Sequence, residues 1–141
     1  MNFDTLFIVA NAIAIFAWLP LFAYPLAPQK IIQTISGLVI PLLLSATYTA
    51  VLLFNWGTGE GNFSSLNGVM TLFQNPASVL AGWVHYLAFD LFVGAWIVRT
   101  AIRDNLHYLV VLPCLPLTLM FGPLGFAAFC VLRLCIKRFN Q

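Results

Sequence analysis

An apolar run over residues 78–102 constrains the fold of this chain more than any other stretch. At about 1.5 Å per helical residue, it is long enough to cross a hydrocarbon core of roughly 30 Å. Asp90 lies about a dozen residues from either end of the run, and its short side chain cannot reach the membrane surface. A charge at that depth costs at least roughly 2.5 kcal/mol. The run therefore predicts a transmembrane helix in which another group compensates Asp90.

Helical spacing places Asp90 on a stripe of residues four apart, which share one face of the helix. The stripe consists of Gly82, Tyr86, Asp90 and Gly94. Tyr86 can donate its hydroxyl to Asp90 one turn away, and the glycines allow close approach by a neighbouring helix, a flat ligand or a second copy in a homo-oligomer. His85 lies about 140° from Asp90 around the axis, so the two do not form a same-face pair.

Composition assigns the chain to the membrane class. Its 141 residues are 62% hydrophobic and 7% charged, whereas soluble domains carry roughly 25% charged residues. We expect one domain, 1–141, with helix packed on helix in the lipid bilayer. A net charge of +2 with no basic, aromatic-rich run excludes nucleic acid as a partner. No removable leader is expected, because the first apolar run begins at once and no basic segment precedes it.

Two further spans are predicted before the central one. The first covers about 3–24 and ends at Pro20 and Pro25, and the second covers about 31–56 with a bend at Pro41. Between the second and third spans, helical spacing over 66–73 predicts a short interfacial helix capped by Ser64 or Ser65. That helix is either a plain connector or a lid.

The last region, about 106–136, contains three prolines and the sequence Phe-Gly-Pro-Leu-Gly at 121–125. This pattern predicts a broken helix bordering a cavity or packed protein, with the hydroxyl of Thr118 nearby. The working model is an all-α bundle of about four transmembrane helices, the last one kinked. The six cations then divide equally between the two membrane faces, whereas a chain that turned back at the break would place all six on one face.

The remaining polar residues leave several roles open. Asn11, Ser45 and Thr49 either hold helices together or contact a substrate or polar path. His85, Asp90 and His107 do not present three metal ligands on one face, and Cys114, Cys130 and Cys135 have no CxxC spacing. We therefore expect no metal and no cofactor.

Two segments, 81–96 and 113–125, carry a resemblance to a known family. Their sequences are AGWVHYLAFDLFVGAW and PCLPLTLMFGPLG. The chain resembles the abscisic-acid-deficient-four-like family of small membrane proteins. The resemblance implies a multi-pass protein of a bacterial inner or thylakoid-type membrane that converts violaxanthin to neoxanthin, or acts on another carotenoid or related isoprenoid.

The chemistry that this resemblance implies is the opening of an epoxide with loss of a neighbouring proton, which leaves an allene and an alcohol. Asp90 is then the candidate acid, His85 the candidate base, and Tyr86 the residue that orients Asp90 or bonds the substrate oxygen. The expected substrate contacts are Trp83, Phe89 and Trp96 as aromatic walls, with Gly82, Gly94 and Thr118.

Three other functions remain open at this point. Asp90 and Tyr86 are equally explained as a polar clamp between helices. The alternatives for the whole protein are a carotenoid-binding or protecting protein without catalysis, and a small transporter or assembly subunit. A transporter requires a continuous polar path past Asp90, whereas the isomerase and the carotenoid-binding protein require a closed apolar cleft of polyene width.

Overall fold

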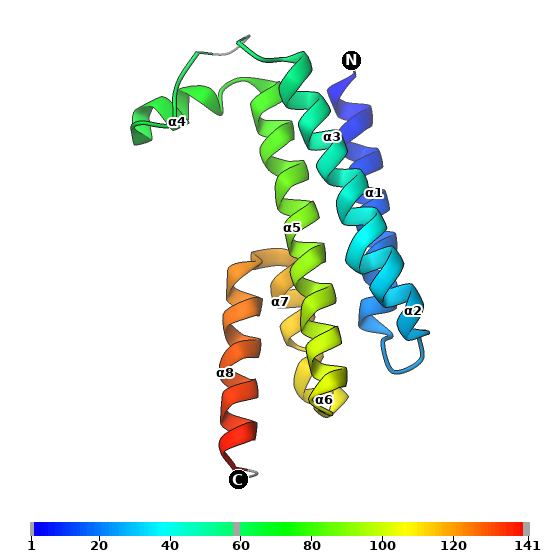
Figure 1. Ribbon diagram of the computed structural model, residues 1–141. Helices are drawn as coiled ribbons and strands as arrows, with labels where there is room; N and C mark the ends of the chain where they lie inside the picture. The colour runs from blue at the N-terminus through cyan, green and yellow to red at the C-terminus, as the bar shows by residue number, and fades with distance from the viewer. Residues whose placement is uncertain (1, 58–59, 140–141) are drawn as a thin grey trace.

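The computed structural model describes residues 2–57 and 60–139, and all regular structure in that part of the chain is helical. Three helical stretches are long and apolar enough to cross a membrane: α1 (Phe3–Phe22), the continuous stretch Gln29–Phe54, and α5 (Pro76–Arg103). They run side by side along the bundle (Figure 1). The prediction of an all-α bundle is confirmed.

Helix α5 is the element around which the others pack. Asn75 caps its first turn by accepting a hydrogen bond from the Ala77 amide at 2.8 Å. Pro76 occupies the first helical position, where a backbone N–H would have no partner within the helix. α5 contacts α1, the Gln29–Phe54 stretch and two helices of the last region, α7 (Cys114–Phe121) and α8 (Pro123–Phe139). In the most apolar 18 residues of α5, 56% of the residues are buried. The corresponding shares are 28% for α1 and 22% for Gln29–Phe54.

Helix α1 approaches α5 through small residues. Ala10, Ala14 and Ala17 are buried and recur at helical spacing along the face that meets α5. Small side chains let helix backbones approach closely, which is how helices gain packing energy where lipid supplies no hydrophobic driving force. Pro20 does not end the helix at once, because α1 continues to Phe22.

The second spanning stretch changes its winding just before Pro41. It begins as α2 (Gln29–Ile31), continues as the π-helix η1 (Ile32–Val39) and becomes α3 (Ile40–Phe54). The wider turns of η1 take the place of the simple bend predicted at Pro41. Ser36 in η1 donates a 2.7 Å hydrogen bond to the Ala17 carbonyl, which ties this stretch to α1.

The predicted interfacial helix is present as α4 (Leu66–Leu72). Ser65 caps it by accepting a hydrogen bond from the Gly68 amide at 3.1 Å, so one of the two predicted caps is correct. α4 lies at the same end of the bundle as the N-terminus (Figure 1).

The last region is broken as predicted, but the chain reverses there. α6 (Tyr108–Val111) and α7 (Cys114–Phe121) lead to Gly122, and α8 (Pro123–Phe139) returns alongside α7 (Figure 1). Gly122 adopts a φ of +33°, and Pro123 starts a new helix immediately after it. The expected single kinked crossing is therefore replaced by a hairpin, whose tip lies halfway along α5.

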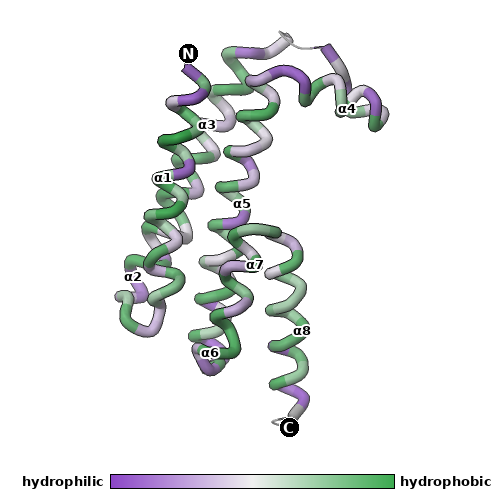
Figure 2. The backbone as a smooth tube through the Cα atoms, turned by 180° about the vertical axis from the view of Figure 1, so that it is seen from behind, coloured by the Kyte–Doolittle hydropathy of each residue, from purple (hydrophilic) through white to green (hydrophobic). Residues whose placement is uncertain are grey.

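This reversal gathers the basic residues at one end of the bundle. α2, the C-terminal end of α5 and the C-terminal end of α8 lie together in Figure 1. They carry all six Lys and Arg residues: Lys30, Arg99, Arg103, Arg133, Lys137 and Arg138. In Figure 2, hydrophilic segments gather at the two ends of the bundle, with a largely hydrophobic body between them. The equal division of cations required by four crossings does not occur.

Candidate functional site

Asp90 is buried halfway along α5. It is the fifteenth of the 28 residues of that helix and is 6% exposed. Its Oδ2 atom has no hydrogen-bond partner among the described residues. A carboxyl group withdrawn from water favours its neutral form, because desolvation penalises the charge. The arrangement therefore suits a group that can hold and release a proton in a dry environment.

Gly122 at the hairpin tip lies directly against Asp90. A Cβ atom at this position would overlap Asp90 Oδ1, and the backbone φ of +33° also favours glycine here. The Gly122 amide donates a 2.9 Å hydrogen bond to the Thr118 carbonyl, which closes α7. Thr118 is fully buried, donates its hydroxyl to the Cys114 carbonyl at 2.7 Å, and packs against Gly125 in the first turn of α8. The Phe-Gly-Pro-Leu-Gly break thus forms the wall beside Asp90.

Tyr86 connects the hairpin to α5. Its hydroxyl donates a 2.6 Å hydrogen bond to the Leu119 carbonyl in α7 and also lies near the Asp90 carboxyl group, with which it interacts. The stripe on α5 predicted the interaction with Asp90 but not the bond to Leu119. Because the Tyr86 hydroxyl donates its proton to the Leu119 carbonyl, the phenol oxygen keeps the capacity to accept a hydrogen bond from a protonated Asp90.

An aromatic wall lies one to two turns before Asp90, where the hairpin no longer covers α5. Trp83 is 40% exposed, and its ring centroid lies 5.5 Å from those of both Phe7 and Tyr86. The Trp83 indole donates a 3.2 Å hydrogen bond to Asn11 in α1. Asn11 therefore joins α1 to α5, as the structural interpretation of this amide predicts. The wall leads from the membrane-facing surface towards Asp90.

Two of the predicted ligand clefts are filled by side chains of the chain itself. The indole of Trp18 packs on Gly94, and the ring of Phe73 lies 2.9 Å from the position that a Cβ atom on Gly82 would occupy. Trp96 packs against Phe126 and Phe129 of α8, at centroid distances of 5.4 and 5.8 Å. These glycines therefore do not themselves support a ligand or homo-oligomer contact.

His85 and Phe89 face a different side of α5 from Asp90. Their rings stack at 4.6 Å, and His85 also lies 5.6 Å from the ring of Tyr48 in α3. His85 is exposed on the surface of the bundle. The structure therefore brings together Trp83, Tyr86 and Asp90, and leaves His85 and Phe89 beside α3.

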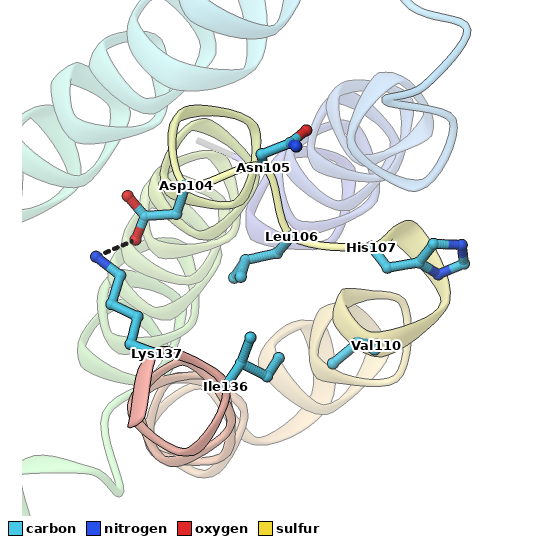
Figure 3. Close-up of a pocket in the computed structure, with 7 residues that line it drawn as sticks. All are labelled: Asp104, Asn105, Leu106, His107, Val110, Ile136 and Lys137. Atoms are coloured by element: carbon cyan, nitrogen blue, oxygen red, sulfur yellow. Dashed lines mark ion pairs between the residues drawn. The ribbon is translucent and has the colours of Figure 1, made fainter. Parts of the chain in front are cut away.

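A second polar cluster lies fourteen residues further along the chain, about 21 Å away by helical rise. Asp104 accepts hydrogen bonds from Arg133 at 2.6 Å and Arg103 at 3.4 Å, and pairs with Lys137 at 2.9 Å. These cations hold the pKa of Asp104 well below its usual range, with Arg133 the largest cause. Figure 3 shows the Asp104–Lys137 pair at the edge of a cavity of about 460 Å³, which His107 also lines. This cluster fastens α8 to the end of α5.

No group of three His, Cys, Asp or Glu residues in the described parts of the chain is arranged to hold a metal ion. Residue patterns did not identify Gly122 and the Leu119 carbonyl as parts of the site. The proline-flanked glycine in the predicted break was the available signal for Gly122.

Comparison with known proteins gives one family. The model of a family described as ABA DEFICIENT 4-like matches residues 5–129. No curated protein and no solved structure matches the chain.

Proposed function

The chain belongs to the ABA DEFICIENT 4-like family, and on that premise we propose that it isomerises an epoxy-carotenoid at the site around Asp90. The family relates the chain to abscisic acid and carotenoid metabolism. The proposed substrate is violaxanthin or a similar epoxy-carotenoid or isoprenoid, taken up from a bacterial inner or thylakoid-type membrane. The observation that carries the proposal is the burial of Asp90 with an Oδ2 atom unpartnered among the described residues.

The surroundings of Asp90 support a polyene as the substrate. Phe7, Trp83 and Tyr86 form a tilted aromatic wall open to the membrane, and flat conjugated chains pack well on such rings. A membrane-dissolved substrate can approach this wall sideways from the lipid. The hairpin tip at Gly122, which lies against Asp90, then stops the epoxide end of the substrate from moving further along α5.

The reaction is balanced without an oxidant or reductant. Neutral Asp90 donates its proton to the epoxide oxygen, and the C–O bond on the polyene side breaks, which leaves a hydroxyl group and a cation delocalised over the polyene. The Asp90 carboxylate then removes the proton from the adjacent polyene carbon, and that C–H electron pair becomes the second double bond of the allene. Asp90 ends in its starting form. Tyr86 holds the carboxyl group in place and bonds the substrate oxygen.

His85 is the alternative candidate for the base that removes the proton. Its contacts are with Tyr48 and Phe89 on the α3 side, so a substrate between His85 and Asp90 would have to pass around α5. We assign the returning proton to Asp90 for this reason. If His85 is the base, His85→Gln abolishes conversion, whereas under our assignment it leaves most of the conversion intact.

A carotenoid-binding protein without catalysis is the second candidate. The same wall and the clamp formed by Tyr86 and the Leu119 carbonyl favour it, since binding needs no proton transfer. A transport function has less support, because three of the polar side chains that could line a path across the membrane form hydrogen bonds within their own helices instead. Asn11, Ser45 and Thr49 donate hydrogen bonds to carbonyls of their own helices, at 2.7, 2.8 and 2.9 Å.

Pigment analysis of a violaxanthin-producing host that lacks neoxanthin tests the proposal. The native protein should produce an allenic product, and Asp90→Asn should reduce its formation by at least about 100-fold, because general acid–base groups contribute on the order of 10² or more. Asp4→Asn, which removes an exposed carboxylate at the start of α1, is the matched control and should convert normally. Equal conversion by Asp90→Asn would contradict the acid role, and pigment bound but unconverted by the native protein would favour the binding function.

A further inference from the structure

Among the residues that the structure describes, Arg99 has no acidic partner, whereas three other cations at this end of the bundle have one. Arg103, Arg133 and Lys137 all pair with Asp104. The half-buried guanidinium of Arg99 makes no hydrogen bond or ion pair with the residues that the structure describes. It lies 5.9 Å from the centroid of the Phe92 ring. Arg99 is one turn before the end of α5, at the end of the bundle that carries the basic residues.

An apolar groove of about 220 Å³ runs between α3 and α5, and Arg99 lies beside two of its lining residues, Gly37 and Phe92. The two helices contribute Pro41, Leu42 and Ser45 on one side and Ala88, Phe89 and Phe92 on the other. Phe92, whose ring lies near the Arg99 guanidinium, is one of these lining residues. The groove itself is therefore mainly apolar, and a cation lies next to part of its lining.

The position of the Arg99 guanidinium depends on the backbone beside it. Gly37 in η1 also lines the groove, and Nη1 of Arg99 lies 2.7 Å from the position that a Cβ atom on Gly37 would occupy. A larger residue at this position would push the guanidinium away. A small cavity of about 40 Å³ is lined by Arg99 together with Gln29 and Gln33. Gln29 and Gln33 thus lie beside the cation and outside the lining of the apolar groove.

We propose that this groove binds an anionic glycerophospholipid, with an acyl chain between α3 and α5 and the phosphate on Arg99. A guanidinium matches phosphate oxygens with two parallel hydrogen bonds, and the amides of Gln29 and Gln33 can bond the rest of the headgroup. The position near the end of α5 corresponds to the depth of lipid headgroups. An uncharged carotenoid would leave Arg99 uncompensated, so this site is separate from the one around Asp90.

Lipid titration of the purified full chain in neutral detergent tests this assignment. Bound lipid is measured by native mass spectrometry with phosphatidylglycerol or phosphatidylcholine of equal chain length. The native protein should prefer phosphatidylglycerol, and Arg99→Gln should weaken its binding about tenfold, as expected for one charge-assisted phosphate contact. Arg138→Gln, which removes an exposed charge at the far end of α8, is the matched control and should change binding less than twofold.

A second variant tests the acyl part of the site without altering charge. Ser45→Phe fills the groove from α3 and should weaken binding of long-chain phosphatidylglycerol while leaving Arg99 in place. It also keeps the test valid if Arg99→Gln fails to fold. Equal affinity of the native protein for both lipids, equal losses in Arg99→Gln and Arg138→Gln, or full competition by inorganic phosphate at the lipid's concentration would each overturn the proposal.

Discussion

The contact between Gly122 and Asp90 leaves no room for a side chain on the glycine. Gly122→Ala would force a methyl group against Asp90 Oδ1 at a backbone φ of +33°. We expect a loss of roughly 1–3 kcal/mol in unfolding free energy from this overlap together with the backbone cost. Chemical denaturation of the protein in detergent micelles measures the loss.

Gly57→Ala is the matched control for the backbone term. Gly57 has a φ of +76°, but a Cβ atom there would meet nothing within 4 Å. This variant should therefore lose only the backbone term, roughly 1 kcal/mol. Equal losses in the two variants would show that the hairpin tip moves away from Asp90 without cost.

Helical geometry predicts only part of the site at this scale. The shared face of Tyr86 and Asp90, and the separation of His85 from both, follow from positions on one helix and needed no tertiary information. The Leu119 carbonyl and Gly122 come from a segment about 30 residues later. Local spacing carries no information about which distant backbone atoms will meet a side chain, so these partners were not predicted.

The hairpin of α7 and α8 depends on Asp104, which gives it a specific sensitivity to acid. Because the pKa of Asp104 is lowered in the folded chain, its pairing with Arg133 and Lys137 stabilises the fold fully above the unfolded-state pKa of about 4. This contribution is lost as the pH falls towards the lower folded-state pKa. The melting temperature in detergent should therefore fall between about pH 5 and pH 2.

Asp104→Asn tests whether this residue causes the acid response. The variant should melt at a lower temperature than the native protein at pH 7 and show a smaller further decrease on acidification. Asp4→Asn, which lies outside the cluster, should keep the native profile. An Asp104→Asn profile parallel to the native one would assign the acid response to other groups.

Local sequence signals predict where a helix begins better than they predict the direction in which the chain continues after a break. Asn75 and Pro76 mark the start of α5, and Ser65 marks the start of α4, because capping is decided within one turn. The direction taken after Gly122 depends instead on the packing of α8 against α5 and on the ion pairs of Asp104. Proline and glycine at 122–123 predicted the break but not the reversal.

Considered as a whole, the bundle has an asymmetric charge distribution that specifies an orientation. α1, Gln29–Phe54 and α5 are long and apolar enough to cross a membrane, and the N-terminus and C-terminus lie at opposite ends of the bundle (Figure 1). From the positive-inside rule, we expect the end that carries the six Lys and Arg residues to lie on the inner side of the membrane. Reporter fusions at the two termini should therefore show the C-terminus inside and the N-terminus outside. Termini on the same side would restore a fourth crossing.

The half-depth hairpin also gives the long helices a tapered outline when α4, which projects sideways at the opposite end, is left aside (Figure 1). α7 and α8 widen the bundle only beside the C-terminal half of α5, so its cross-section is larger in the leaflet next to the basic residues than in the opposite leaflet. Each inserted copy thus displaces more lipid from one monolayer than from the other. A membrane densely filled with copies in one orientation would relieve that mismatch by bowing towards the wider side.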